Sequence, residues 1–145
     1  MSTRGLLGFR VNGQDYITYN HSDSYPQWLG MRVVQFAHDH LHSLEAIQAF
    51  GRKIEALGWD LIPREARSAQ PQGPELLAAI AEGRVLRVGK GRDLFHTCLD
   101  CEFAYVLDLD EGQLEFWDLP DLVATFPLLD ANTCNVDVME CERRR

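Results

Sequence analysis

The strongest constraint on the fold is a pair of predicted β-hairpins, one in each half of the chain. In the first, Asn12-Gly13 separates an apolar segment, residues 6–11, from a second strand-like segment, residues 16–19. Asn and Gly tolerate the positive φ angles of tight turns, which makes this dipeptide a strong hairpin signal. In the second, residues 101–118 alternate in polarity on both sides of an Asp-Glu-Gly turn. Arg10 alternates with apolar neighbours, which predicts that its side chain faces solvent.

Helical periodicity fills much of the segment between the hairpins. Residues 31–57 have apolar residues at three- and four-residue spacing, and a predicted N-cap at Ser43 divides them into two helices, the second ending at Gly58. A shorter helix is predicted from Pro74 to Gly83. The other expectations are a loop at residues 60–74, one helical turn within 120–129, a strand at 136–139 and a frayed end at 140–145. This order predicts an α+β fold of antiparallel sheets with packed helices.

The length of 145 residues and the 46% hydrophobic content fit one globular domain spanning residues 1–145. The sequence has no apolar run long enough for a membrane helix, and the apolar stretch near its N-terminus is too short for a signal peptide. These features predict a cytoplasmic protein without a membrane partner. They leave open whether it forms a homodimer.

The formal net charge of −8 is unevenly distributed. Residues 1–92 hold eleven basic and nine acidic residues, whereas residues 93–142 hold thirteen acidic residues and no Lys or Arg. Extended nucleic acid requires a basic face and is therefore not an expected partner. A small anion would find its cations in the first two thirds of the chain.

The string YNHSDSYP, residues 19–26, followed by Trp28, Leu29 and Gly30, is the most distinctive candidate site. It concentrates aromatic rings, hydroxyls, an imidazole, an amide and a carboxylate at the end of a predicted strand, where binding sites are often built. The same residues also suit a structural corner, with Asn and Asp capping turns. The candidate ligand-binding residues are Tyr19, Asn20, His21, Asp23, Ser24, Tyr25 and Trp28.

Cations that could neutralise a phosphate or carboxylate are Arg4, near the N-terminus, and Arg84 and Arg87, in a basic stretch with interspersed glycines. This stretch does not match a P-loop, because Gly91 occupies the position of the Ser or Thr that such a loop requires. Solvated surface charge is the alternative interpretation of these arginines.

No metal or other cofactor is predicted. Cys98 and Cys101 have a zinc-like spacing, but Cys134 and Cys141 do not, and reduced cysteines are the simpler interpretation. His38 and His42 would share a helix face, yet a third ligand cannot be assigned. A solvated helix end accounts for these histidines.

Ser2 is the candidate catalytic residue. Removal of Met1 would leave its α-amine beside its hydroxyl, the arrangement in which an N-terminal amine acts as base for the nucleophile. With Met1 retained, that amine is blocked by a peptide bond.

The sequence resembles a group of small bacterial and phage proteins with Thr3-Arg4-Gly5 before an apolar strand, then YNHSDSYPQWLG, and later CEFAYVLDLDEGQLEFWD. Those proteins are similar in their opening hairpin and following helices to the N-terminal nucleophile hydrolase fold. The resemblance covers residues 2–42 and 101–118. It implies a sandwich of antiparallel sheets with outer helices, and a pocket at the end of the first hairpin.

Three functions follow as hypotheses. The first is a phage-encoded anti-defence protein of the host cytoplasm that binds and sequesters a nucleotide-derived or other polar anionic signal. The second is an amide hydrolase that uses Ser2. The third is an acidic decoy whose second hairpin binds a basic protein partner. The first is not an enzyme, and it requires no cofactor.

Overall fold

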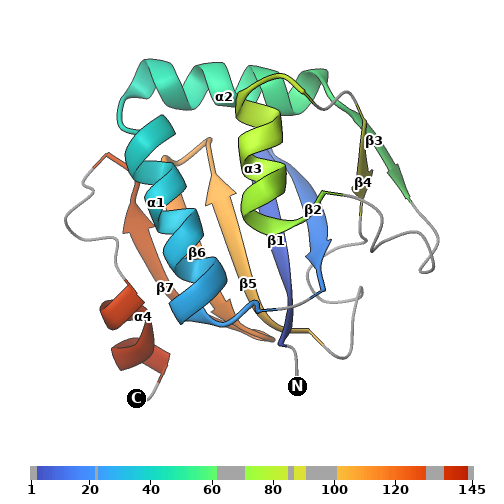
Figure 1. Cartoon of the computed structure of the whole chain (residues 1–145). Helices are drawn as coiled ribbons and strands as arrows, with labels where there is room; N and C mark the ends of the chain where they lie inside the picture. Colours follow the sequence, from blue (N-terminus) through green and yellow to red (C-terminus); the bar gives the residue numbers. More distant parts are fainter. Residues whose placement is uncertain are drawn as a thin grey trace.

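The two predicted hairpins lie in one sheet of the computed structural model (Figure 1). The first consists of β1 (Arg4–Val11) and β2 (Gln14–Asn20), and the second of β5 (Cys101–Asp108) and β6 (Gln113–Asp118). The strand order is β2-β1-β5-β6-β7, with β7 spanning Asp121–Pro127. The structure describes residues 3–21, 23–61, 71–84, 87–90, 101–129 and 136–143.

The sheet is mixed, which corrects the expectation of purely antiparallel sheets. β1 and β5 run parallel, whereas the pairs β1–β2, β5–β6 and β6–β7 are antiparallel. Parallel neighbours require a long crossover, and here the chain between β1 and β5 includes three helices. A second sheet within the described residues is the parallel pair β3 (Gly58–Leu61) and β4 (Arg87–Lys90). The α+β class is confirmed.

Three helices cover one face of the large sheet: α1 (Met31–His40), α2 (Leu44–Ala56) and α3 (Gly73–Ala81) (Figure 1). Ser43 caps α2 as predicted, because its side chain accepts a hydrogen bond from the backbone N–H of Ala46. The main core lies between these helices and the sheet, and Leu7, Phe9 and Val11 of β1 are buried in it. The alternate residues of β1 point to the other face of the sheet. There Leu6 of β1, Ile17 of β2, and Ala104 and Val106 of β5 belong to a smaller cluster.

Two terminal elements differ from prediction. Residues 121–127 form strand β7 rather than a helical turn, and residues 136–143 form helix α4 (Val136–Arg143) rather than a strand. In β7 only Phe126 is buried, so the periodicity of this edge strand is weak. In α4, Val136 and Val138 alternate like strand residues, but Glu140 and Arg143 form an ion pair across one helical turn.

Residues 60–74 also contain more regular structure than the loop predicted for them. β3 occupies its beginning and α3 begins at Gly73, one residue before the expected Pro74. The rest of that loop, residues 62–70, lies outside the described residues. Within the described part of the chain, no helix combines the length and apolar character needed to cross a membrane.

Candidate functional site

The loop after β2 forms a corner whose centre is held by hydrogen bonds. Asn20 Nδ2 donates to Ser24 Oγ over 2.8 Å, and the backbone N–H of Ser24 donates to the carbonyl of Thr3 over 3.0 Å. Tyr105, from β5, donates its hydroxyl to the carbonyl of Ser24 over 2.8 Å. Asn20, Ser24 and Tyr105 are all buried. Asn20 and Ser24 therefore hold the corner together, which is the role they have if this loop is a structural corner rather than a binding site.

The corner also depends on a close approach between backbone segments. A Cβ atom on Gly5 would lie 2.6 Å from Ser24 Cβ and 2.7 Å from the carbonyl oxygen of Phe103. Only glycine fits between the loop and β5 at this point. Burial raises the pKa of Tyr105 above its usual range, and the nearby Glu140 carboxylate raises it further. The Tyr105 hydroxyl therefore keeps its proton and remains a hydrogen-bond donor to the carbonyl of Ser24.

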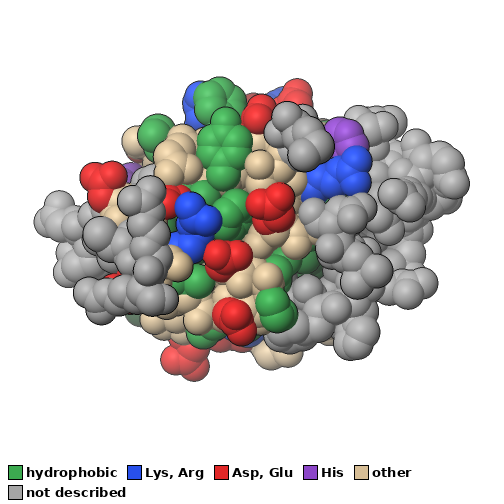
Figure 2. All heavy atoms as spheres, turned by 90° about the horizontal axis from the view of Figure 1, so that it is seen from below, with side chains coloured by type: hydrophobic (Ala, Val, Ile, Leu, Met, Phe, Trp, Pro, Cys, Tyr) green, Lys and Arg blue, Asp and Glu red, His purple; other side chains and the backbone are tan. Residues whose placement is uncertain are grey.

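Arg4, Tyr19 and His21 form a polar group beside this corner, which we call the β2-end cluster. Tyr19 Oη and His21 Nδ1 are 3.1 Å apart, and the backbone N–H of His21 donates to Gln72 Oε1 over 2.7 Å. The β1–β2 register pairs Gly5 with Asn20 and Leu6 with Tyr19, which places Arg4 beside His21 on the sheet face that Tyr19 occupies. Seen from below, the described surface mixes acidic, basic and hydrophobic side chains, and one basic side chain lies against a histidine (Figure 2).

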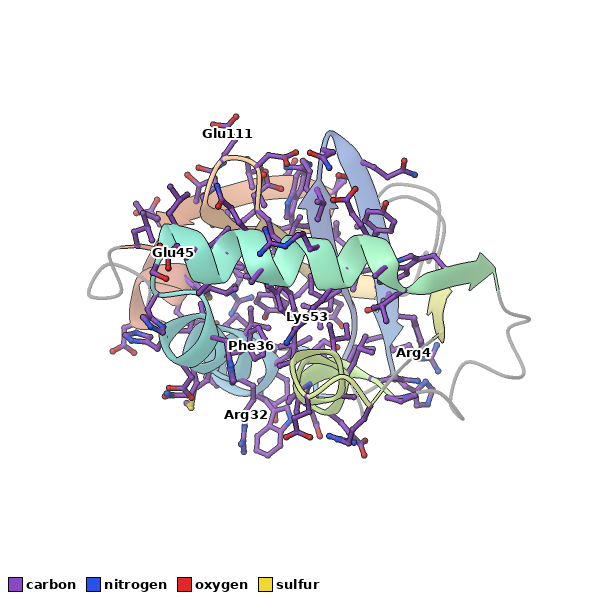
Figure 3. All side chains as sticks on the ribbon, turned by 90° about the horizontal axis from the view of Figure 1, so that it is seen from above. Arg4, Arg32, Phe36, Glu45, Lys53 and Glu111 are labelled. Carbon is purple, nitrogen blue, oxygen red and sulfur yellow. The ribbon has the colours of Figure 1, made fainter. Side chains whose placement is uncertain are left out.

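The exposed aromatic residues of the predicted site lie elsewhere on the corner. Tyr25 precedes a five-residue π-helix, η1 (Pro26–Gly30), which continues into α1 and carries Trp28. The side chains of Tyr25 and Trp28 are 37% and 43% exposed. The guanidinium carbon of Arg32 lies 4.4 Å from the centre of the Trp28 ring. Figure 3 shows Arg4 and Arg32 on opposite sides of α3, so the two arginines serve different surfaces.

The structure does not gather all the predicted residues into one site. Arg84 follows the C-terminal end of α3 and pairs with Glu82. The corner lies at the other end of this helix, where Gly73 approaches Asn20. Arg87 begins β4, opposite Gly58 of β3, and its side chain lies outside the described part. Asp23 is exposed with a positive φ of 53°. Ser2 lies outside the described residues, so its catalytic role stays a prediction.

Arg10 corrects a further expectation, because it is the centre of an ion-pair network rather than a solvated side chain. It contacts Asp15 at 2.7 Å, Asp108 at 3.0 Å and Glu115 at 2.7 Å. Asp108 and Glu115 are themselves buried. Hydrogen bonds and attraction to Glu115 and Asp15 outweigh the cost of burial and raise the pKa of Arg10. The network joins four adjacent strands on the sheet face opposite the helices.

The predicted absence of a metal site is not tested over the whole chain. Among the residues that the structure describes, His, Cys, Asp and Glu side chains form no group suited to a metal ion. Cys101 is buried and forms no disulfide within the described residues, whereas Cys98 and Cys134 lie outside the description. His42 follows the end of α1, so it does not share a helix face with His38 as expected.

Comparisons with protein-family models, with curated proteins and with solved structures find no match to this chain. The geometry described above is therefore the basis for any statement about its function.

Proposed function

We propose that this protein binds a small polar anion at the β2-end cluster and acts as a binding protein rather than an enzyme. The observation that carries the proposal is the contact between Tyr19 Oη and His21 Nδ1 at 3.1 Å, on the sheet face that Arg4 shares. A cation, a phenol and an imidazole side by side provide charge, hydrogen-bond donors and a stacking surface.

The phenol contact also orients the imidazole. When Tyr19 donates to Nδ1, a neutral His21 ring carries its proton on Nε2, and a protonated ring likewise donates from Nε2. Nε2 has no hydrogen-bond partner within the described residues, and the His21 side chain is exposed. A donor on an exposed ring, next to the strand that begins at Arg4, suits a phosphate or carboxylate group.

The acidic decoy receives less support from the second hairpin. Asp108 and Glu115 pair with Arg10, and Asp110 accepts hydrogen bonds from the backbone N–H groups of Asn12 and Gly13. Three carboxylates of this hairpin therefore stabilise the protein's own turn and sheet. They are less available to a basic partner than the sequence alone suggests.

The resemblance to small phage proteins extends the proposal to a ligand class. We infer a nucleotide-derived signal, sequestered by a phage protein with an N-terminal-nucleophile-hydrolase-like sandwich. The alternative amide hydrolase differs in requiring Ser2 with a free amine.

Isothermal titration against a panel of cyclic and linear nucleotides, with inorganic phosphate included, tests the proposal. We expect saturable binding of at least one nucleotide, weakened about tenfold or more by Arg4→Gln and by His21→Gln. His38→Gln, at an exposed position on α1, is the matched control and should bind normally. Absence of heat with the whole panel, or equal binding by all variants, contradicts the proposal.

A second measurement separates binding from hydrolysis. Intact-mass spectrometry reports whether Met1 is removed, and Ser2→Ala should leave ligand binding unchanged. If the native protein lacks Met1 and consumes an amide substrate in a Ser2-dependent reaction, the hydrolase is correct and the binding proposal is wrong.

A further inference from the structure

A groove of about 170 Å³ lies between α1 and α3, on the helical surface and apart from the β2-end cluster. Its floor is apolar, with Phe36 and Leu77 buried at its base. The groove exists because α3 presents small side chains, Ala78 and Ala81, toward α1. Phe36 is labelled within the space between these two helices in Figure 3.

The aromatic lining of the groove continues to its rim. The ring of His40 stacks on Phe36, with centroids 4.6 Å apart and planes 27° from parallel. At the other end of α1, Arg32 lines the groove and stacks on Trp28. An arginine held by an indole loses less rotational freedom when it binds an anion.

Arg32 is distinguished from the other charged groups of the groove by its unused donors. Asp39 accepts a hydrogen bond from Gln35 over 3.1 Å, and Glu82 pairs with Arg84. The guanidinium of Arg32, by contrast, donates no hydrogen bond to any residue in the described part of the chain. Arg32 therefore has donors left with which it can pair with a carboxylate at its end of the groove.

The volume of the groove limits the size of the group that can occupy it. Pockets that enclose small molecules measure roughly 300–1,000 Å³, well above the 170 Å³ found here. A groove of this size accepts about one apolar side chain. The adjoining surface carries Trp28 and Met31, which are 43% and 51% exposed, and Trp, Met and Arg are enriched in protein interfaces.

We propose that the α1–α3 groove docks a segment of a partner protein that inserts one apolar side chain beside an Asp or Glu, whose carboxylate pairs with Arg32. This surface is separate from the β2-end cluster and is independent of the anion bound there. Trp28 and Met31 would flank the inserted side chain and exclude water from the ion pair.

Selection from a displayed library of random twelve-residue peptides tests this inference, with the full chain as bait. We expect the selected peptides to share an apolar residue next to Asp or Glu. Synthetic copies should bind about tenfold or more weakly to Arg32→Gln, which removes the cation, and to Ala78→Leu, which fills the groove. Arg52→Gln, an exposed arginine of α2 outside this groove, is the matched control and should bind like the wild type.

Three outcomes would overturn the inference: no peptide enriched on the wild type relative to Arg32→Gln, peptides without an acidic residue, or a dimer in sedimentation that Ala78→Leu dissociates. The last result would make the groove an interface between copies of this chain. Thermal unfolding of each variant shows whether lost binding reflects lost folding. Arg4→Gln should bind these peptides normally, which keeps this test distinct from that of the anion site.

Discussion

Among single residues, Tyr105 links the corner to the pH dependence of stability. Its usual pKa is 10.0, and burial raises that value in the folded protein. Between pH 10 and the raised pKa, the folded state keeps a proton that the unfolded state loses. Stability is therefore expected to fall by about 1.4 kcal/mol per pH unit above pH 10 because of this residue.

Tyr105→Phe isolates this effect. At pH 8 the variant should be about 1–2 kcal/mol less stable than the wild type, since the carbonyl of Ser24 loses its donor. Above pH 10 the difference should shrink, because phenylalanine has no proton to lose. Urea unfolding at pH 8, 10 and 11 measures both, with the exposed Tyr25→Phe as control. A difference that stays constant with pH contradicts the account.

The residues also show what a local pattern can and cannot predict. Alternation correctly separated Arg10 from its apolar neighbours, which are buried in the core, but it could not show what lies opposite Arg10. Its partner Asp108 is 98 residues away in the sequence. Composition singled out the polar loop as a candidate site, but it could not distinguish Asn20, which is buried, from His21, which is exposed.

At the scale of elements, the contact between the corner loop and β1 depends on Gly5. Gly5→Ala places a methyl group against Ser24 Cβ and the Phe103 carbonyl, which are fixed in the backbone or close to it. At Gly8 the nearest atom, at 2.5 Å, is the terminal methyl of Ile17, which can rotate away. We expect Gly5→Ala to lower the free energy of unfolding by about 1–3 kcal/mol and Gly8→Ala by less than 1 kcal/mol.

Chemical denaturation of the two variants tests this difference. Both variants carry the same substitution on the same strand, so they differ mainly in what the added methyl group contacts. Equal losses in the free energy of unfolding would show that the corner loop moves to accommodate the methyl group added at Gly5. In that case the hydrogen bonds around Ser24 would not restrain the loop.

The elements predicted correctly are those with strong local signals. Both hairpins, the capped helix α2 and the short helix α3 follow from turn residues, caps and periodicity. The parallel pairing of β1 with β5 has no local signal, because it joins strands separated by most of the chain. β7 and α4 were assigned wrongly, since packing against neighbouring elements decides such short segments.

For the molecule as a whole, the prediction that residues 1–145 form one domain depends on contacts between its layers. Phe9 makes such a contact, because it is fully buried on β1 and its ring lies 5.8 Å from that of Phe50 on α2. The ring of Trp59 on β3 is 6.3 Å away. One side chain therefore joins the large sheet, the helical layer and the small sheet.

Phe9→Leu should thus destabilise all three layers together, by about 1–1.5 kcal/mol. Far-UV circular dichroism reports the helices and strands, whereas tryptophan fluorescence, in a background with Trp28→Phe and Trp117→Phe, reports Trp59 among its aromatic neighbours. In a single cooperative domain, the two urea transitions coincide in the wild type and shift by the same amount in the variant. If the fluorescence transition alone moves, β3 unfolds independently of the sheet, and the chain comprises more than one cooperative unit.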